Sequence, residues 1–332
     1  MLDRDPWTVT LAGPAPDAAP AELLRFALHV ALTAPSPANS QPWRLRFVDD
    51  EQVELFEDPA RALPVRDPEG QQRIVACGAA LGLLRVALRA TGLGETTICW
   101  PQGPPDRSLP DGPAPLARVA LTGSVAPTPE ETWLLQAAPK RRTHRGVFAD
   151  RPVRERLLQR LREVARDAGV ELHVLGEPQR AALAARVDAA ARAQASDSAA
   201  LAERATWPEP GPEPFAAGDG APARGEQIAA GAPVLAVITT PDDGPQAWLR
   251  AGEALIRVLL RGRVDQLYAT FLHGPLTRAA DRWALAEELA VLGDMSQTPG
   301  FVQLALRLGY AADLPPTPRR PLADVLLAAP TP

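Results

Sequence analysis

Residues 21–34 read AELLRFALHVALTA, and residues 155–168 read ERLLQRLREVARDA. The two segments match at a constant offset of 134 residues, through Leu23 with Leu157, Leu24 with Leu158, Val30 with Val164, Ala31 with Ala165 and Ala34 with Ala168. These identities fall at helical spacing, so they predict a helix with the same buried face in each half of the chain. The repetition indicates two tandem copies of one folding unit.

Two further blocks repeat in the same order. CGAALGLLRVAL (residues 77–88) matches AGEALIRVLL (251–260) at an offset of 174, and the strand-like LARVALTG (116–123) matches VQLALRLG (302–309) at an offset near 186. The first two offsets differ, so the second half has extra residues between its first two helices. We expect a lid-like insertion at about 193–227, which is rich in Pro and Gly. A binding loop or a disordered segment are the alternatives.

The expected fold class is α+β. Strands are predicted at residues 44–48, 52–56, 116–121, 171–175, 233–239 and 302–308, with helices over much of the rest. The first two are separated by Asp49-Asp50-Glu51, which predicts a hairpin and sheets that are mixed or antiparallel. Neither G-x-G-x-x-G nor a P-loop follows a strand, so any phosphate must be held differently. We expect one half at 1–135 and the other at 136–332.

Composition narrows the functional classes. The chain has 332 residues, 46% of them hydrophobic, which suits two domain-sized units. A net charge of −5, from 35 basic and 40 acidic residues, argues against a general nucleic-acid binder. The N-terminal residues do not resemble a signal peptide, and no apolar run reaches the roughly 18 to 20 residues that span a membrane. With only Cys77 and Cys99, a disulfide framework or zinc site is disfavoured, and we expect a cytoplasmic protein.

Three motifs carry polar groups suited to a ligand. APSPANSQPW (34–43) places Ser36, Asn39 and Gln41 on a backbone stiffened by prolines, where the alternative is an ordinary helix-to-strand connection. KRRTHRGVF (140–148) is a local anion site or a solvated basic linker. TPRRPL (317–322) directs two arginines at an anion or forms a solvated tail.

These motifs resemble the signatures of nitroreductase-type flavoproteins, namely A-P-S-x-x-N-x-Q-P-W, R-R-S-x-R-x-F and a C-terminal R-x-P-L. Together with ARALPVRDPEG (60–70), CGAAL (77–81) and WLRAGEAL (248–255), in this order, they resemble the Acg-type branch, whose chains are internally duplicated. The resemblance covers roughly residues 21–325. It implies a nitroreductase-like fold in which mixed or antiparallel central sheets are flanked by helices and two copies form a single-chain pseudo-dimer.

The resemblance also implies one FMN site per chain. In ordinary nitroreductases each subunit carries both signatures, and FMN lies at the dimer interface. Here the residues 134 positions before Arg141–Arg145 are Trp7–Leu11, without a cation, and those 134 positions after 34–43 are 168–177, without Ser, Asn or Gln. Each half has therefore kept one part of the site. One complete pocket across the internal interface and one degenerate pocket are expected.

Carried over residue by residue, the cofactor-binding set is Ser36, Asn39, Gln41, Arg141, Arg142, Thr143, Arg145, Arg319 and Arg320. The resemblance gives Arg141 and Thr143 to the FMN phosphate and ribityl chain, with Arg319 or Arg320 closing on the phosphate. Arg145 is expected at the pyrimidine edge, where a fixed cation stabilises the reduced flavin. Ser36 and Asn39 are expected to contact the ring. The flavin supplies the chemistry, so no catalytic side chain and no metal are expected.

Two histidines and one cysteine lie near these motifs. His144 is expected to be structural, whereas His273 follows the second repeated helix, where the family places a segment near the flavin N5 edge. Cys77 is expected to be a small core residue rather than a redox group.

Three functions remain open on the sequence. The first is an FMN-dependent oxidoreductase that passes hydride from NAD(P)H to a nitroaromatic, a quinone or a similar small planar acceptor. The second is a flavin-sequestering protein in which the lid-like insertion covers the flavin. The third is a flavin-free interaction protein on a degenerate scaffold. Because the duplication already supplies the usual dimer surface, we expect a monomer.

Overall fold

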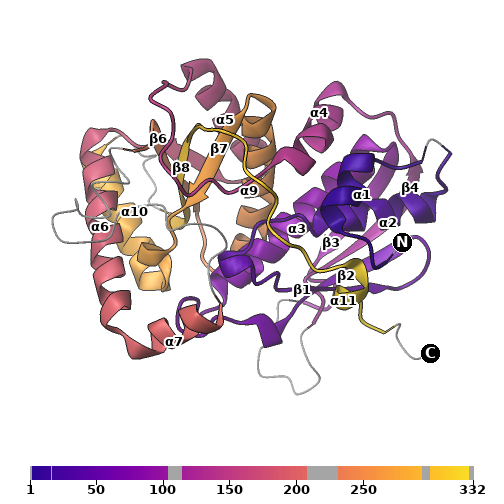
Figure 1. Ribbon diagram of the computed structural model, residues 1–332, viewed down its shortest axis with the longest axis horizontal. Helices are drawn as coiled ribbons and strands as arrows, with labels where there is room; N and C mark the ends of the chain where they lie inside the picture. Colours follow the sequence, from indigo (N-terminus) through magenta and orange to yellow (C-terminus); the bar gives the residue numbers. More distant parts are fainter. Residues whose placement is uncertain (1, 16, 104–113, 208–230, 294–299, 329–332) are drawn as a thin grey trace.

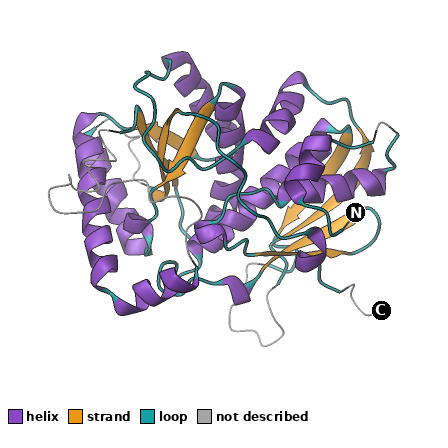
Figure 2. Ribbon diagram, viewed as in Figure 1, coloured by secondary structure: helices purple, strands orange, loops and turns teal. Residues whose placement is uncertain are grey.

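Two four-stranded antiparallel sheets form the framework of the protein. The computed structural model describes residues 2–15, 17–103, 114–207, 231–293 and 300–328. The strand order is β1-β2-β4-β3 in the first sheet and β5-β6-β8-β7 in the second, so the second sheet repeats the topology of the first. Figures 1 and 2 show the two sheets side by side, each with its own helices. The α+β class and the tandem duplication are thus confirmed.

The elements of the first half, in chain order, are α1 (Pro6–Ala12), α2 (Pro20–Ala31), η1 (Pro37–Asn39), β1 (Trp43–Phe47), β2 (Gln52–Glu57), η2 (Pro59–Arg61), α3 (Gln71–Ala90), β3 (Leu93–Cys99), β4 (Ala117–Ser124), α4 (Pro129–Ala137) and η3 (Ala138–Lys140). Those of the second half are α5 (Glu155–Asp167), β5 (Glu171–Val174), α6 (Glu177–Ser196), α7 (Ser198–Thr206), β6 (Val234–Thr240), α9 (Pro245–Val264), β7 (Leu267–Phe271), η4 (Gly274–Leu276), α10 (Ala279–Leu292), β8 (Phe301–Tyr310) and α11 (Leu322–Val325). The predicted boundary at 135/136 falls in the last turn of α4 and stays a prediction.

The predicted strands correspond to β1, β2, β4, β5, β6 and β8, and the predicted hairpin is the antiparallel pair β1 and β2. The prediction missed β3 and β7, which lie at the edges of their sheets. The outer part of β3 is solvent-exposed, so it lacks the apolar alternation by which a half-buried strand is recognised. No helix in the described part of the chain is long and apolar enough to cross a bilayer.

The two halves join through α3 and α9, the repeated helices at offset 174, which lie between the sheets (Figure 1). At the crossing, a Cβ on Gly78 would lie 2.2 Å from the carbonyl oxygen of Leu249, and a Cβ on Gly252 would lie 2.1 Å from that of Val75. Only glycine permits this approach in both helices. Gly78 and Gly252 occupy matching positions in the repeat, as expected for a pseudo-dimer.

The extra residues of the second half lie between β5 and β6. In the first half β1 ends at Phe47 and β2 begins at Gln52, whereas β5 ends at Val174 and β6 begins at Val234. The excess therefore begins earlier than the expected position 193, and it includes α6 and α7. Residues 193–206 are largely helical, while 208–230 lie outside the described residues. The alanine-rich sequence of α6 has high helix propensity, and the Pro- and Gly-rich stretch by which the insertion was placed begins only after α6 and α7.

Candidate functional site

A cavity of about 470 Å³ lies between the two halves. Its size is within the range of about 300–1,000 Å³ that is usual for small-molecule sites. The first half contributes residues 36–38 together with Leu63, Arg66 and Gln72. The second half contributes Thr143 and Arg145, the strand residues Thr270 and Arg307, residues 271–274 and 277, and one face of α6 and α7.

Residues of two sequence motifs meet in this cavity. Ser36 comes from the first motif, and Thr143 and Arg145 come from the second. The second motif is held against the second sheet, because the His144 amide donates to the carbonyl oxygen of Ala269 in β7 at 3.0 Å. The Ser36 hydroxyl accepts a hydrogen bond from the Gln41 amide at 2.9 Å. The two motifs thus form opposite walls of one space.

The first motif has a strained backbone. Ala38, Asn39 and Gln41 have positive φ angles of 48°, 52° and 49°, although none of them is glycine. Each such residue costs on the order of 1–3 kcal/mol and persists only where its surroundings enforce it. Pro37 and Pro42 restrict the backbone here, and Ala38 lines the cavity. Strain of this kind is typical of ligand-binding loops.

The buried Arg141 and the half-buried Arg319 converge beside the first motif. Nη2 of Arg141 donates to the carbonyl oxygen of Thr33 at 3.0 Å. Nη2 of Arg319 lies 3.4 Å from the same oxygen and donates to the carbonyl oxygen of Ala34 at 3.1 Å. Nη1 of Arg319 donates to Oδ1 of Asn39 at 2.8 Å. Arg141, Arg319 and Asn39 are therefore gathered at the carboxyl end of α2.

Neither Arg141 nor Arg319 forms an ion pair with a carboxylate in the described part of the chain, although the charge of Asp5 acts weakly to raise the pKa of Arg319. Burial, and next the positive charge of Arg142, lower the pKa of Arg141 to about 9. Burial, and next the charge of Arg141, lower the pKa of Arg319 well below its usual value. Nε of Arg319 is buried without a hydrogen-bond partner. An anion bound here would supply the missing negative charge and acceptor.

Three other predicted residues bond to the chain itself. Nη1 of Arg142 donates to the carbonyl oxygens of Pro139 and Arg141, at 2.9 and 2.7 Å. Arg320 forms an ion pair with Asp58 at 3.5 Å, so of the two adjacent arginines it is Arg319 that approaches Arg141. Oε1 of Gln41 accepts from the Arg320 amide at 2.8 Å. These contacts fasten the C-terminal segment to the first half, where Figure 1 shows it ending in α11.

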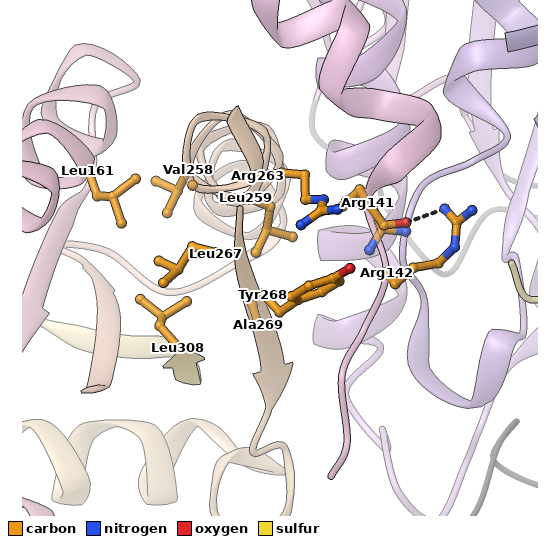
Figure 3. Close-up of a pocket in the computed structure, with 11 residues that line it drawn as sticks. Arg141, Arg142, Leu161, Val258, Leu259, Arg263, Leu267, Tyr268, Ala269 and Leu308 are labelled. Atoms are coloured by element: carbon orange, nitrogen blue, oxygen red, sulfur yellow. Dashed lines mark hydrogen bonds between the residues drawn. The ribbon is translucent and has the colours of Figure 1, made fainter. Parts of the chain in front are cut away.

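A much smaller void of about 10 Å³ lies on another side of Arg141, and it is no candidate for an organic ligand. Figure 3 shows apolar side chains of α5, α9 and β8 on one side of it and Arg141, Arg142 and Tyr268 on the other. Its volume is at most that of a single water molecule. Together with the surrounding apolar wall it explains why burial dominates the pKa shift of Arg141.

Sequence reasoning missed part of the cavity wall. Thr270 of β7 and Arg307 of β8 are direct cross-strand partners, and both line the cavity. Oγ1 of Thr270 is buried and has no hydrogen-bond partner within the described parts of the chain. Arg307 is fully buried, and Nη2 donates to the carbonyl oxygens of Gly146 and Gly231, each at 3.2 Å. An arginine between two leucines in a predicted buried strand was the available signal.

The two histidines and the cysteine that lie near the motifs in sequence occupy different places in the structure. His273 lines the cavity and stacks on Phe271 at 5.4 Å. His144 packs on Phe148 and Tyr268, and burial lowers its pKa. Cys77 is buried, and Sγ lies 3.2 Å from the Pro42 carbonyl oxygen.

The roof of the cavity is formed by α6 and α7. Figure 1 shows α6 along the outer edge of the second half and α7 turning from it toward the first half. The buried carboxylate of Glu203 accepts hydrogen bonds from the amides of Val65 and Arg66, at 2.8 and 3.2 Å, and from Nε of Arg66 at 2.9 Å. This contact fastens the roof to the first half. A ligand in the cavity would be covered on this side.

No protein-family model matches the chain. It is 33% identical to "Putative NAD(P)H nitroreductase Rv3131" of Mycobacterium tuberculosis, with 92% of this chain and 91% of that protein covered. It is 28% identical to "Putative NAD(P)H nitroreductase acg" of the same species, with 92% and 95% covered. Among solved structures, an FMN complex of a nitroreductase from Desulfovibrio desulfuricans has 21% identity and a TM-score of 0.41, covering 62% of this chain and all of that one.

Proposed function

The chain belongs to the nitroreductase-like superfamily, in its Acg-type branch, and on this premise we propose that it binds one FMN between its two halves and acts as an FMN-dependent oxidoreductase. Family membership follows from the relative with 33% identity across nearly the whole of both chains. The names of the two relatives, both NAD(P)H nitroreductases, support NAD(P)H-linked nitroreduction as the activity class. The cavity between the halves supports the position of the cofactor.

One observation carries the proposal: the guanidinium groups of the buried Arg141 and the half-buried Arg319 meet at the carbonyl oxygen of Thr33, and neither forms an ion pair with a carboxylate in the described part of the chain. Like charges in a buried site destabilise the protein unless an anion binds there. A phosphate monoester supplies two negative charges and several acceptors, including one for Nε of Arg319. The residues present therefore fit the phosphate of FMN.

The other residues fit the rest of the cofactor. Thr143 offers a hydroxyl for the ribityl chain, and Ser36 lies on the facing wall for the ring. Arg145 lines the same cavity, where a fixed cation favours negative charge on a reduced ring over the neutral oxidised form. Asn39 acts on the site through Arg319, whose Nη1 it holds at 2.8 Å. Bound FMN would supply the hydride chemistry, and these side chains would hold and orient it.

We infer that the electron donor is NAD(P)H and that the acceptor is a small planar molecule such as a nitroaromatic or a quinone. A cavity of about 470 Å³ is large enough for one flavin. The same observation supports a second candidate function. Because α6 and α7 roof the cavity and Glu203 fastens them, a flavin-sequestering protein with little turnover is the alternative.

Flavin reduction and reoxidation separate these two functions. The FMN-loaded protein is mixed anaerobically with NADPH or NADH, and the flavin absorbance is followed before and after addition of a nitroaromatic or a quinone. An oxidoreductase bleaches with a nucleotide and recovers with an acceptor over many cycles. Flavin that stays bound and oxidised under both nucleotides would support sequestration. Protein that retains no FMN would contradict both functions.

A further inference from the structure

Trp7 of α1 lies between two of the arginines beside the proposed phosphate site. The guanidinium of Arg142 is 4.4 Å from the centre of the indole ring, and that of Arg319 is 5.1 Å from it. Nε1 of Trp7 donates to the carbonyl oxygen of Thr317 at 2.7 Å. The ring is 6% exposed, so these contacts form away from bulk water. Trp7 therefore contacts both the side chain of Arg319 and the segment that precedes it.

The ring has an electrostatic effect on Arg319. Arg141 and Arg142 both repel the Arg319 guanidinium, as the lowered pKa of Arg319 reflects after the larger effect of burial. The face of an indole ring carries negative electrostatic potential, and Trp binds cations more strongly than the other aromatic side chains. Trp7 thus offsets part of the repulsion among the arginines. It does so without using Nε of Arg319, which has no hydrogen-bond partner among the described residues.

The position of Trp7 in the repeat is informative. Trp7 precedes Arg141 by the offset of 134 residues that relates α2 to α5. The first half therefore has an aromatic residue where the second half has a buried arginine. The local backbones differ, since Trp7 is helical and Arg141 is extended. The half without the cation still contributes a side chain to the site of the other half.

We propose that Trp7 is a positioning residue for phosphate recognition: its ring and its Nε1 hold Arg319 charged and oriented toward the phosphate of FMN. This inference rests on the proposed function, because it assigns the phosphate to Arg141 and Arg319. It predicts that Trp7 affects the affinity for FMN but not the affinity for riboflavin, which lacks the phosphate.

The test compares the dissociation constants of FMN and riboflavin for the full-length protein, measured by quenching of flavin fluorescence. Wild-type protein is expected to bind FMN at least tenfold more tightly than riboflavin. Trp7→Leu should weaken FMN binding about tenfold and leave riboflavin binding unchanged. Trp7→Phe, with a weaker ring potential, should give a smaller loss, so the test does not depend on folding of the leucine variant. Trp133→Leu, at an exposed tryptophan of α4, is the matched control and should change neither constant.

Each other outcome has a defined meaning. Equal weakening of both flavins by Trp7→Phe or Trp7→Leu would show a merely structural role and overturn the inference. An unchanged preference for FMN in both variants would also overturn it. Wild-type protein that binds both flavins equally would refute the phosphate assignment, and wild-type protein that binds neither would refute the proposed function itself.

Discussion

Arg141 and Arg319 approach the same backbone oxygen, the carbonyl of Thr33, at 3.0 and 3.4 Å. Thr33 belongs to the first half, and both arginines come from segments that follow it by more than a hundred residues. The turn that follows the carboxyl end of α2 thus holds two cations through a backbone carbonyl. The proposed anion site therefore combines residues from both halves.

Arg141→Met should weaken FMN binding and stabilise the flavin-free protein. Losing one charge-assisted hydrogen bond, worth about 1.5–3 kcal/mol, predicts between about tenfold and a hundredfold weaker binding. Replacing a buried charge with an apolar side chain should raise the free energy of unfolding by about 1–4 kcal/mol. Flavin titration and urea denaturation measure the two effects. Lys140→Met, at the exposed neighbouring cation, is the control. Flavin-free Arg141→Met protein that is less stable than flavin-free wild-type protein would contradict the reasoning.

Thr270→Val should separate ligand binding from stability in the same way. The buried hydroxyl has no partner among the residues that the structure describes, so its removal should leave Tm unchanged or raise it in flavin-free protein, because a desolvation cost of about 1–3 kcal/mol disappears. FMN affinity should fall, since Thr270 lines the cavity and its hydroxyl is the polar group that a ligand there could bind. Thr239→Val is the contrast, because the hydroxyl of Thr239 is 3.0 Å from Nε2 of His173. Thr239→Val should lose stability and keep its flavin affinity. If Thr270→Val instead loses stability and keeps its flavin affinity, Thr270 is not part of the site.

Glu203→Gln should loosen the roof. The carboxylate accepts from two amides and from Nε of Arg66, and the neutral amide of glutamine accepts these bonds more weakly. We expect FMN to dissociate about tenfold faster, as measured by stopped-flow release into excess apoflavodoxin. Glu177→Gln, at an exposed acid on α6, serves as the control. An unchanged release rate would mean that α7 does not limit access to the cavity.

The buried ion pair of Asp243 and Arg282 should make stability depend on pH. Burial acts to raise the pKa of Asp243, but hydrogen bonds from Arg282, Trp248 and Gln303 outweigh it, and the net pKa is lowered. A lowered pKa in the folded state stabilises the protein above the unfolded pKa of about 3.9, and this stabilisation is lost as pH falls below that value. The urea midpoint of wild-type protein should therefore decrease as the pH is lowered from 5 to 3. Asp243→Asn should make this decrease smaller. Asp17→Asn, at an exposed position, should keep the wild-type slope.

The sequence predicted the duplication because both copies must bury the same helix face, and the paired Leu24 and Leu158 record that requirement. It also predicted that Ser36 would lie across one pocket from Thr143 and Arg145, and the structure brings these residues together. The other residues of the site could not be predicted, because their proximity depends on pairing between strands. Thr270 and Arg307 become neighbours only through the register of β7 and β8. Likewise, the choice between Arg319 and Arg320 depends on the position of Asp58, which no motif indicates.

The most direct test of the central claim is the number of FMN molecules bound per chain. Flavin-free protein of known oligomeric state is titrated with FMN by calorimetry, alongside the Arg141→Met variant. One FMN per chain, with binding strongly weakened in the variant, is the predicted result. Two FMN per chain would mean that the second pocket is intact, one per two chains would place the site between chains, and no binding would contradict the account.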